Sequence, residues 1–244
     1  AIYENLFQSP HFSTLEKFKA LNGLREIEKA KFRLYQGELA PFLAASKRTS
    51  RYAEATLRSA TGLNFDDRRI LYEGWLQYAR DEWSYGDVAL TFGELNLVLA
   101  FNGLELPFHA HALWTLARVY ANTGDWLNAA EIGEKSGRLL ESDLGNSAAW
   151  SKWQWALWDD SLWMAALAHR KIQDWTTASS LLDLAIRYTR SANSGFKFTF
   201  WLAICMKDQG VTTVAESYFR QLKDSDPFGF YGFLAHRELH ELLS

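Results

Sequence analysis

Cysteine and proline are scarce in this chain. Its 244 residues include one cysteine and four prolines. The single cysteine, Cys205, forms no disulfide within the chain, which fits a cytosolic protein and also a periplasmic one that folds without such bonds. The few prolines permit long helices, because a proline in a helix interior removes a hydrogen bond and clashes with the preceding turn.

An excess of one charge is also lacking. Lys and Arg number 26 against 29 Asp and Glu, for a net charge of -3. This balance argues against a nucleic-acid partner recognised through a broad basic face. No uninterrupted apolar run approaches the roughly 20 residues that span a bilayer, and no signal peptide is evident. We therefore expect no membrane span.

Helix signals recur along the chain, whereas no alternating run bounded by hairpin turns predicts a strand. Ser13 and Glu16 form a capping box that predicts a helix start, and Asn22-Gly23 predicts its end. A second helix is expected from Leu24 to about Ala45. Further helices are expected over residues 52–60, 67–83 and 87–101.

Three segments match the tetratricopeptide pattern, in which a tight turn is followed by a small residue on the second helix. Their turns, at positions 124, 173 and 210, are about 49 and about 37 residues apart, against about 34 in a regular repeat. The repeats are therefore irregular. The matching residues are Gly124, Asp125 as N-cap, Trp126 and Ala129; Asp174, Trp175, Ala178, Leu182 and Ala185; and Gly210, Ala215, Phe219 and Pro227.

These patterns predict an all-α fold of irregular tetratricopeptide-like helical hairpins stacked as an α-solenoid, in which each hairpin buries its apolar face against its neighbours. We expect one domain over residues 10–244. Residues 1–9 are a possible tag remnant or disordered start, since Glu4–Ser9 nearly spell a tag-protease site.

The C-terminal segment from Asp226 to Ala235 reads DPFGFYGFLA. It resembles the P-x-x-[FY]-Y-G-x-L-A segment that closes the helical superhelix of soluble lytic murein transglycosylases, and the resemblance covers about residues 196–240. It implies a helical scaffold domain in a periplasmic cell-wall protein, with peptidoglycan or cell-wall proteins as partners and no cofactor.

The catalytic residue of that family is a Glu in a Glu-Ser pair, followed by a Gly-Leu-Met-Gln motif. This chain has Glu141-Ser142 and Glu216-Ser217 but no Gly-Leu-Met-Gln. No catalytic residue can be carried over from the resemblance, so we expect this chain to be non-catalytic.

Tryptophans crowd one stretch, and their role has two interpretations. Large aromatic side chains fill wide gaps between irregular hairpins, which would place them in the core. Flat aromatic faces also stack on sugar rings, so some of them are candidates for binding a glycan ligand. The candidate ligand-binding residues are Trp150, Trp153, Trp155 and Trp158, with Trp163 nearby.

Four aromatic residues of the C-terminal segment form a candidate docking patch: Phe228, Phe230, Tyr231 and Phe233. Pro227 ends one helix, and Gly229 permits a bend. Gly232 allows a neighbouring group to approach closely. The patch either docks whatever follows the solenoid or belongs to a terminal capping helix.

Other polar pairs predict no chemistry. His236 and His240 share a helix face, but Arg237 stands where a zincin has Glu, and no further ligand completes a metal site. The neighbouring carboxylates Asp66-Asp67 and Asp159-Asp160 diverge on a helix, so helix N-capping is the expected role of both pairs.

Three functions compete. The first is the non-catalytic scaffold domain of a lytic transglycosylase-like protein. The second is a free-standing tetratricopeptide adaptor, possible in the cytoplasm, that holds a partner peptide in its groove. The third is an enzyme in its own right. A groove of exposed tryptophans would favour the scaffold domain. A polar groove that binds peptide backbone would favour the adaptor. A cleft with a strongly perturbed carboxylate would favour the enzyme.

Overall fold

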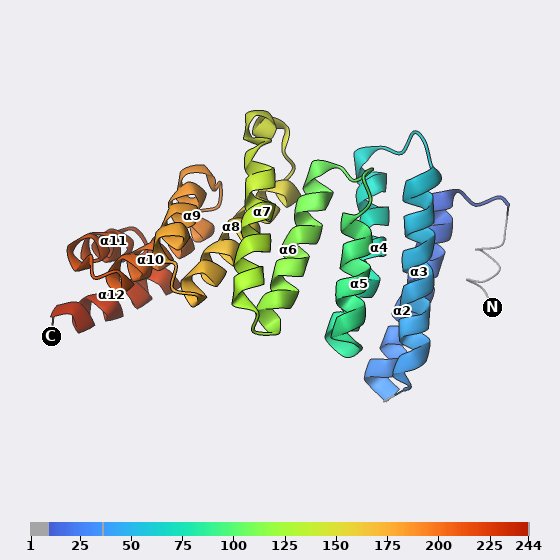
Figure 1. The fold of residues 1–244 in the computed structure, drawn as a ribbon, viewed down its shortest axis with the longest axis horizontal. Coiled ribbons are helices and arrows are strands. Elements are labelled where there is room, and N and C mark those ends of the chain that lie inside the picture. The colour runs from blue at the N-terminus through green and yellow to red at the C-terminus, as the bar shows by residue number, and fades with distance from the viewer. Residues whose placement is uncertain (1–9, 36, 244) are drawn as a thin grey trace. The chain divides into compact units, whose positions relative to one another are not determined.

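The computed structural model describes residues 10–35 and 37–243, except the side chains of Tyr35 and of residues 241–243. The expectation for residues 1–9 lies outside the described residues. The described ranges contain helices and no strand, which confirms the all-α prediction (Figure 1). The helices are α2 Thr14–Tyr35, α3 Leu39–Ser59, α4 Phe65–Tyr85, α5 Val88–Leu99, α6 Leu106–Asn122, α7 Trp126–Glu141, the short 3-10 helix η1 Leu144–Ala149, α8 Lys152–Lys171, α9 Trp175–Tyr188, α10 Ala192–Asp208, α11 Thr212–Ser225 and α12 Phe230–Leu243.

The chain divides into two compact units, Ala1–Ala112 and Leu113–Ser244, which we call the first and second units. In a solenoid each hairpin contacts only its neighbours, so the division does not by itself make two domains. Across the described ranges, no helix combines the length and the apolar character that a membrane span needs.

In the first unit, α2 packs on α3, and α4 packs on both α3 and α5. A buried polar network joins three of these helices. The Arg25 guanidinium of α2 donates to Asp81 of α4 through Nε (2.7 Å) and Nη2 (2.8 Å). The hydroxyl of Ser46 on α3 donates to the same carboxylate at 2.5 Å. An interior carboxylate with these partners keeps its hydrogen bonds satisfied.

The predicted helix end at Asn22-Gly23 is wrong, because α2 continues through Gly23 to Tyr35. Phe18 and Leu21 before the glycine and Arg25 after it are all buried. Burial on both sides outweighs the cost of about 1 kcal/mol for glycine inside a helix. Consequently the helices predicted over 24–45 and 52–60 are also misplaced, since one helix, α3, spans Leu39–Ser59.

The predicted capping box is confirmed, with the Ser13 backbone N–H donating to Glu16 at 2.8 Å and the Glu16 N–H donating to the Ser13 hydroxyl at 3.3 Å. The prediction that Asp66 and Asp67 cap a helix is wrong, because both lie in the first turn of α4. The N-cap there is Asn64, whose side chain accepts from the Asp67 N–H at 2.9 Å. Aspartates in a first turn still interact favourably with the helix dipole.

The second unit contains the three predicted hairpin turns. Gly124 and Gly210 adopt the left-handed conformation, with φ of 84° and 80°. Asp125 and Asp174 cap α7 and α9 by accepting from the N–H groups of Asn128 and Thr177. The second helices α7, α9 and α11 each present a fully buried alanine after the turn, namely Ala129, Ala178 and Ala215. We call α6, α8 and α10 the first helices of these hairpins.

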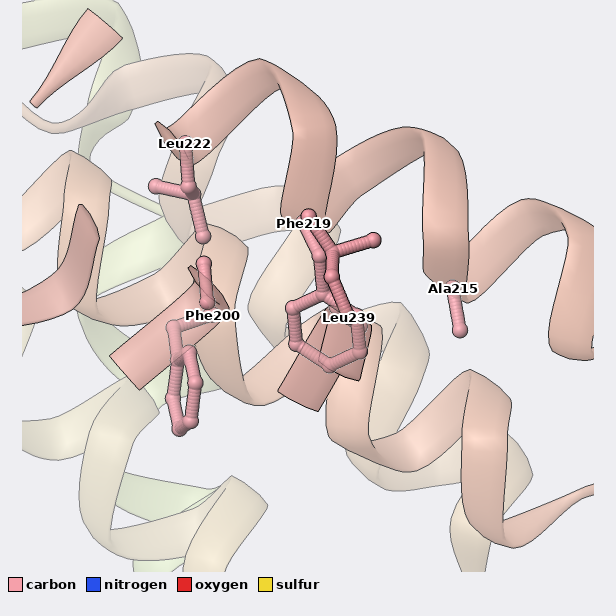
Figure 2. Close-up of a cluster of buried hydrophobic side chains, with 7 residues drawn as sticks. Phe200, Ala215, Phe219, Leu222 and Leu239 are labelled. Carbon is pink, nitrogen blue, oxygen red and sulfur yellow. The ribbon is translucent and has the colours of Figure 1, made fainter. Parts of the chain in front are cut away.

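The last hairpin closes around an aromatic cluster. Phe200 of α10, Phe219 and Leu222 of α11, and Leu239 of α12 pack together beside Ala215 (Figure 2). Between α11 and α12 the chain wraps around Asp226. Its carbonyl accepts from the Gly229 N–H (3.0 Å), and its carboxylate accepts from the Gly232 N–H (3.3 Å).

This turn confirms the predicted close approach at Gly232. A Cβ atom on Gly232 would lie 1.8 Å from the Asp226 carbonyl oxygen, which is backbone and cannot move aside easily. We therefore expect Gly232→Ala to lower the free energy of unfolding by about 1–3 kcal/mol, the usual cost of forced overpacking.

Urea unfolding followed by circular dichroism measures this effect. Gly145→Ala is the control, since a Cβ there meets nothing within 4 Å. An equal loss of stability in both variants, or none in Gly232→Ala, would contradict the steric account of this turn.

Candidate functional site

The four candidate tryptophans occupy different environments. Trp158 on α8 is completely buried and meets Tyr188 of α9 edge to face, at 6.3 Å between ring centroids. Trp150 precedes α8 and is 8% exposed, and its Nε1 donates to Asp143 at 2.8 Å. Trp153 and Trp155 are half-buried. Trp158 is therefore a core residue whose faces no ligand can reach, and the ligand-binding prediction rests on the other three.

Trp150 and Trp155 form an aromatic corner, with ring centroids 4.9 Å apart and planes inclined by 56°. The Arg190 guanidinium, just before α10, lies 4.2 Å from the Trp155 ring centroid. This corner lines an open pocket of about 520 Å³ between the starts of α8 and α10, which we call the α8–α10 pocket. Asp159, Asp160 and Ser194 also line it.

The prediction that Asp159 and Asp160 cap a helix is wrong. They lie in the middle of α8, which begins at Lys152. Its N-cap is Ser151, whose hydroxyl accepts from the Gln154 N–H at 3.3 Å while the Gln154 side chain accepts from the Ser151 N–H at 2.9 Å. A complete capping box leaves no N-terminal role for carboxylates two turns later.

Asp159 is instead a buried carboxylate facing the beginning of α10. Its Oδ2 accepts from the Thr189 hydroxyl at 2.9 Å. The Ser194 hydroxyl also hydrogen-bonds to this carboxylate. Trp155 Nε1 is a solvent-shielded donor without a partner among the described residues, and such groups are uncommon in folded proteins.

The charges around the pocket are partly removed from water. Burial raises the pKa of Asp159, and hydrogen bonds from Ser194 and Thr189 and the charge of Lys197 only partly oppose it. Burial also raises the pKa of Asp160. Burial lowers the pKa of Lys197, although both aspartates favour its charged form. Burial disfavours the charged form of each of these groups, so the pKa rises for the two aspartates and falls for the lysine.

Tryptophans and charged side chains continue from this pocket across the first helices. Trp114 of α6 donates through Nε1 to the Asp160 carbonyl oxygen at 3.2 Å. Trp163 of α8 lies 5.5 Å from Trp201 of α10, centroid to centroid. Cationic groups lie over these rings: Lys197 Nζ is 5.0 Å from the Trp163 centroid, and the Arg170 guanidinium is 5.1 Å from that of Trp201.

We call this surface the tryptophan face of the second unit. All four of its rings are half-buried, so each combines core packing with a surface that a partner can contact. Its residues are Trp114, Trp155, Trp163 and Trp201 with Arg118, Asp160, Arg170, Arg190 and Lys197.

Sequence reasoning did not identify Trp114, Trp201 or the cations. One signal was available, since Arg118 follows Trp114 by four positions, the spacing that places two side chains on one helix face. The guanidinium carbon of Arg118, Cζ, lies 4.7 Å from the Trp114 ring centroid.

The predicted docking patch separates into two parts. Phe228, Phe230 and Phe233 are largely exposed. Tyr231 is half-buried and packs against the cluster of Figure 2, at 5.9 Å from Phe200 between centroids. Tyr231 thus contributes to the closure of the last hairpin, and docking by the three phenylalanines stays a prediction.

His236 and His240 lie edge to face, with ring centroids 4.8 Å apart. Among the described residues, no group of three or more His, Cys, Asp or Glu side chains is arranged to hold a metal ion.

Comparison with known proteins identifies the fold. No model of a known protein family matches the chain, and no curated protein matches it. The structure resembles a variant of a Podosopora anserina protein described as a candidate kinesin light chain with nearly identical TPR-like repeats. The TM-score is 0.58 at 18% identity, over 88% of this chain and 96% of that one.

It also resembles a signal transduction ATPase with numerous domains and a tetratricopeptide repeat sensor, from Pyrococcus horikoshii. The TM-score is 0.59 at 11% identity, over 91% of this chain and 32% of that one. At these identities the likeness shows the fold alone: a tetratricopeptide-like repeat solenoid, as the sequence predicted.

The raised pKa of Asp159 has a consequence for stability. Such an acid keeps its proton to higher pH in the folded state than in the unfolded chain, where an aspartate titrates near about 3.9. Its stabilising contribution is therefore greatest below that pH and is lost as the pH rises through the folded-state pKa. Asp159→Asn cannot ionise, so we expect its melting temperature, relative to the parent chain, to rise between pH 4 and pH 7.

Thermal unfolding followed by circular dichroism across this pH range measures whether the relative melting temperature rises or falls. Asp183→Asn, at a partly exposed carboxylate on α9 that pairs with Arg187, controls for the change in net charge. A relative melting temperature that falls over the range for Asp159→Asn would contradict the account.

Proposed function

We propose that the chain is a helical-repeat scaffold that binds a segment of a partner protein along the tryptophan face. One observation carries the proposal: half-exposed tryptophans and cations are gathered on the neighbouring first helices α8 and α10 and on the nearby part of α6. Stacked hairpins bring first helices together into an extended surface, and repeat proteins use such surfaces for binding.

The chemistry of the face favours a protein segment. Tryptophan and arginine are the residue types most enriched among the side chains that dominate binding energy in protein interfaces. A half-buried tryptophan is already held in place by its neighbours, so binding costs little further side-chain entropy. The cations over the rings and the carboxylate of Asp160 add charges that can select among segments.

The fold similarity supports the same proposal. The tetratricopeptide repeats of the Pyrococcus horikoshii protein are described as a sensor, and the Podosopora anserina protein is described as a candidate light chain of kinesin. Both descriptions fit repeat arrays that work through other molecules. A free-standing adaptor with this role is compatible with a cytoplasmic location.

A second candidate is the scaffold domain of a periplasmic cell-wall protein related to lytic transglycosylases. The aromatic corner of Trp150 and Trp155 beside two carboxylates favours it, since aromatic faces stack on sugars while carboxylates accept from their hydroxyl groups. The resemblance at Asp226–Ala235 is the remaining support. The turn around Asp226 gives its glycines a local structural reason that requires no shared function.

A peptide selection tests the first candidate. We expect phage-displayed 12-residue peptides selected on the parent chain to lose affinity at least about tenfold on Trp201→Ala, as is usual for an interface tryptophan. Trp126→Ala is the matched control, because Trp126 is also partly buried but begins the second helix α7. Isothermal titration calorimetry provides the dissociation constants. Equal losses in both variants, or no selectable peptide, would contradict the proposal.

Sedimentation with insoluble peptidoglycan separates the two candidates. If protein segments are the ligands, the chain stays in the supernatant and mass spectrometry detects no released anhydro-muropeptide. Co-sedimentation that Trp155→Ala abolishes and Trp126→Ala preserves would favour the cell-wall candidate instead. Released anhydro-muropeptides would indicate catalysis.

A further inference from the structure

We propose that the tryptophan face binds an acidic partner segment, in which two carboxylate side chains about four residues apart pair with Arg190 and Lys197. This inference rests on the proposed function and adds the charge of the partner. It follows from which charged groups of the face already have partners and from where the others lie.

The face carries a surplus of positive charge. Its four cations are Arg118, Arg170, Arg190 and Lys197, and its one carboxylate is Asp160. The whole chain has the opposite balance, with a net charge of -3, so the surplus belongs to this surface and does not follow from the composition. Interfaces commonly match such a surface with the opposite charge on the partner.

Two of these cations have no ion-pair partner in the part of the chain that the structure describes. Arg170 is paired with Asp208, at 3.1 Å between Nη2 and Oδ2. Arg190 and Lys197, by contrast, neither form an ion pair with a described carboxylate nor donate a hydrogen bond to a described residue. Their N–H groups are therefore open to an anion from a partner.

The neighbouring aspartates do not cancel the positive charge. Asp159 is buried, and its carboxylate already accepts hydrogen bonds from two hydroxyl groups of the chain. Burial raises the pKa of Asp160, and the charges of Lys197 and Arg118 oppose that rise. One exposed carboxylate is thus shared between two cations, which leaves positive charge for a partner to meet.

The tryptophan rings hold both cations without using their donors. The Arg190 guanidinium lies 4.2 Å from the Trp155 ring centroid, and Lys197 Nζ lies 5.0 Å from the Trp163 centroid. A guanidinium over a ring still has N–H donors along its edge, where a carboxylate can accept two hydrogen bonds. Because the rings already restrict both side chains, pairing with an anion costs little further side-chain entropy.

The spacing along α8 sets the length of the segment. Trp155 and Trp163 are eight residues apart on this helix, which is about 12 Å along its axis at about 1.5 Å per residue. An extended chain advances about 3.3 Å per residue, so about four residues cover this distance. Carboxylates at the first and fifth positions of a segment can therefore reach both cations, with the residues between them against the tryptophan face.

The test uses three five-residue peptides, acetyl-X-Ala-Leu-Ala-X-amide, in which X is glutamate, glutamine or lysine. Titration followed by NMR of the indole N–H signals of Trp155 and Trp163, assigned with Trp155→Phe and Trp163→Phe, provides the dissociation constants. We expect the glutamate peptide to bind about tenfold more tightly than the glutamine peptide, which has the same shape, as for two partly exposed ion pairs. The lysine peptide should bind most weakly. Raising the ionic strength to about 1 M, where the Debye length is about 3 Å, should remove most of the difference.

Matched variants locate the effect. Arg190→Gln and Lys197→Gln each remove one ion pair, so each should reduce the preference for glutamate over glutamine about threefold. Arg190 is exposed, so its replacement leaves the interior undisturbed. Lys197→Arg keeps the charge and should retain the preference. Lys135→Gln makes the same change in net charge at an exposed lysine of the second helix α7 and should leave the preference unchanged.

The inference is overturned if the glutamate peptide binds no more tightly than the glutamine peptide, or if its preference persists at high ionic strength. A preference that Arg190→Gln and Lys197→Gln both leave intact would also overturn it. The phage-selected peptides separate this inference from the proposed function. If they depend on Trp201 but are not enriched in Glu and Asp, the inference alone fails and the proposed function stands. If no peptide can be selected, both fail.

Discussion

Close contact between helices through small side chains sets the geometry on which the second unit depends. Ala129, Ala178 and Ala215 are completely buried after the three hairpin turns, and a Cβ on Gly133 of α7 would lie 3.2 Å from the backbone of Ala165 on α8. Helices this close leave no room for large side chains at their contact. The large residues of α8 therefore pack elsewhere: Trp158 meets α9, and Trp163 meets α10. The tryptophan face is thus a consequence of how the hairpins pack.

Local signals in the sequence predicted much of this fold, because turns and caps depend on residues close together in the chain. Gly124, Gly210, Asp125 and Asp174 act as their types and spacing predicted. The predictions were wrong where residues far apart in the sequence determine the local structure. Gly23 does not end its helix because its neighbours are buried by tertiary packing, which sequence propensity does not contain. The sequence did not predict the buried position of Asp159, since its hydrogen-bond partner Thr189 is 30 residues away.

The candidate site was predictable only in part for the same reason. The sequence indicated that some tryptophans of residues 150–163 are core and others exposed, but assigning each one requires knowing what packs against it. Trp158 faces α9, whereas Trp155 lines the pocket with Arg190 on its ring. Trp114 and Trp201 lie far away in the sequence and join the face only because first helices become neighbours. The C-terminal motif, by contrast, depends on residues close together in the sequence: its glycines are explained by one tight turn around Asp226.

The most direct test of the tryptophan face as a binding surface is hydroxyl-radical footprinting with mass spectrometry, which measures how accessible each tryptophan side chain is. A bound partner segment should reduce oxidation of Trp155, Trp163 and Trp201 and leave Trp126, which begins the second helix α7, unchanged. Protection of Trp126 without protection of Trp163 and Trp201 would contradict the account, since it would place the partner on another surface.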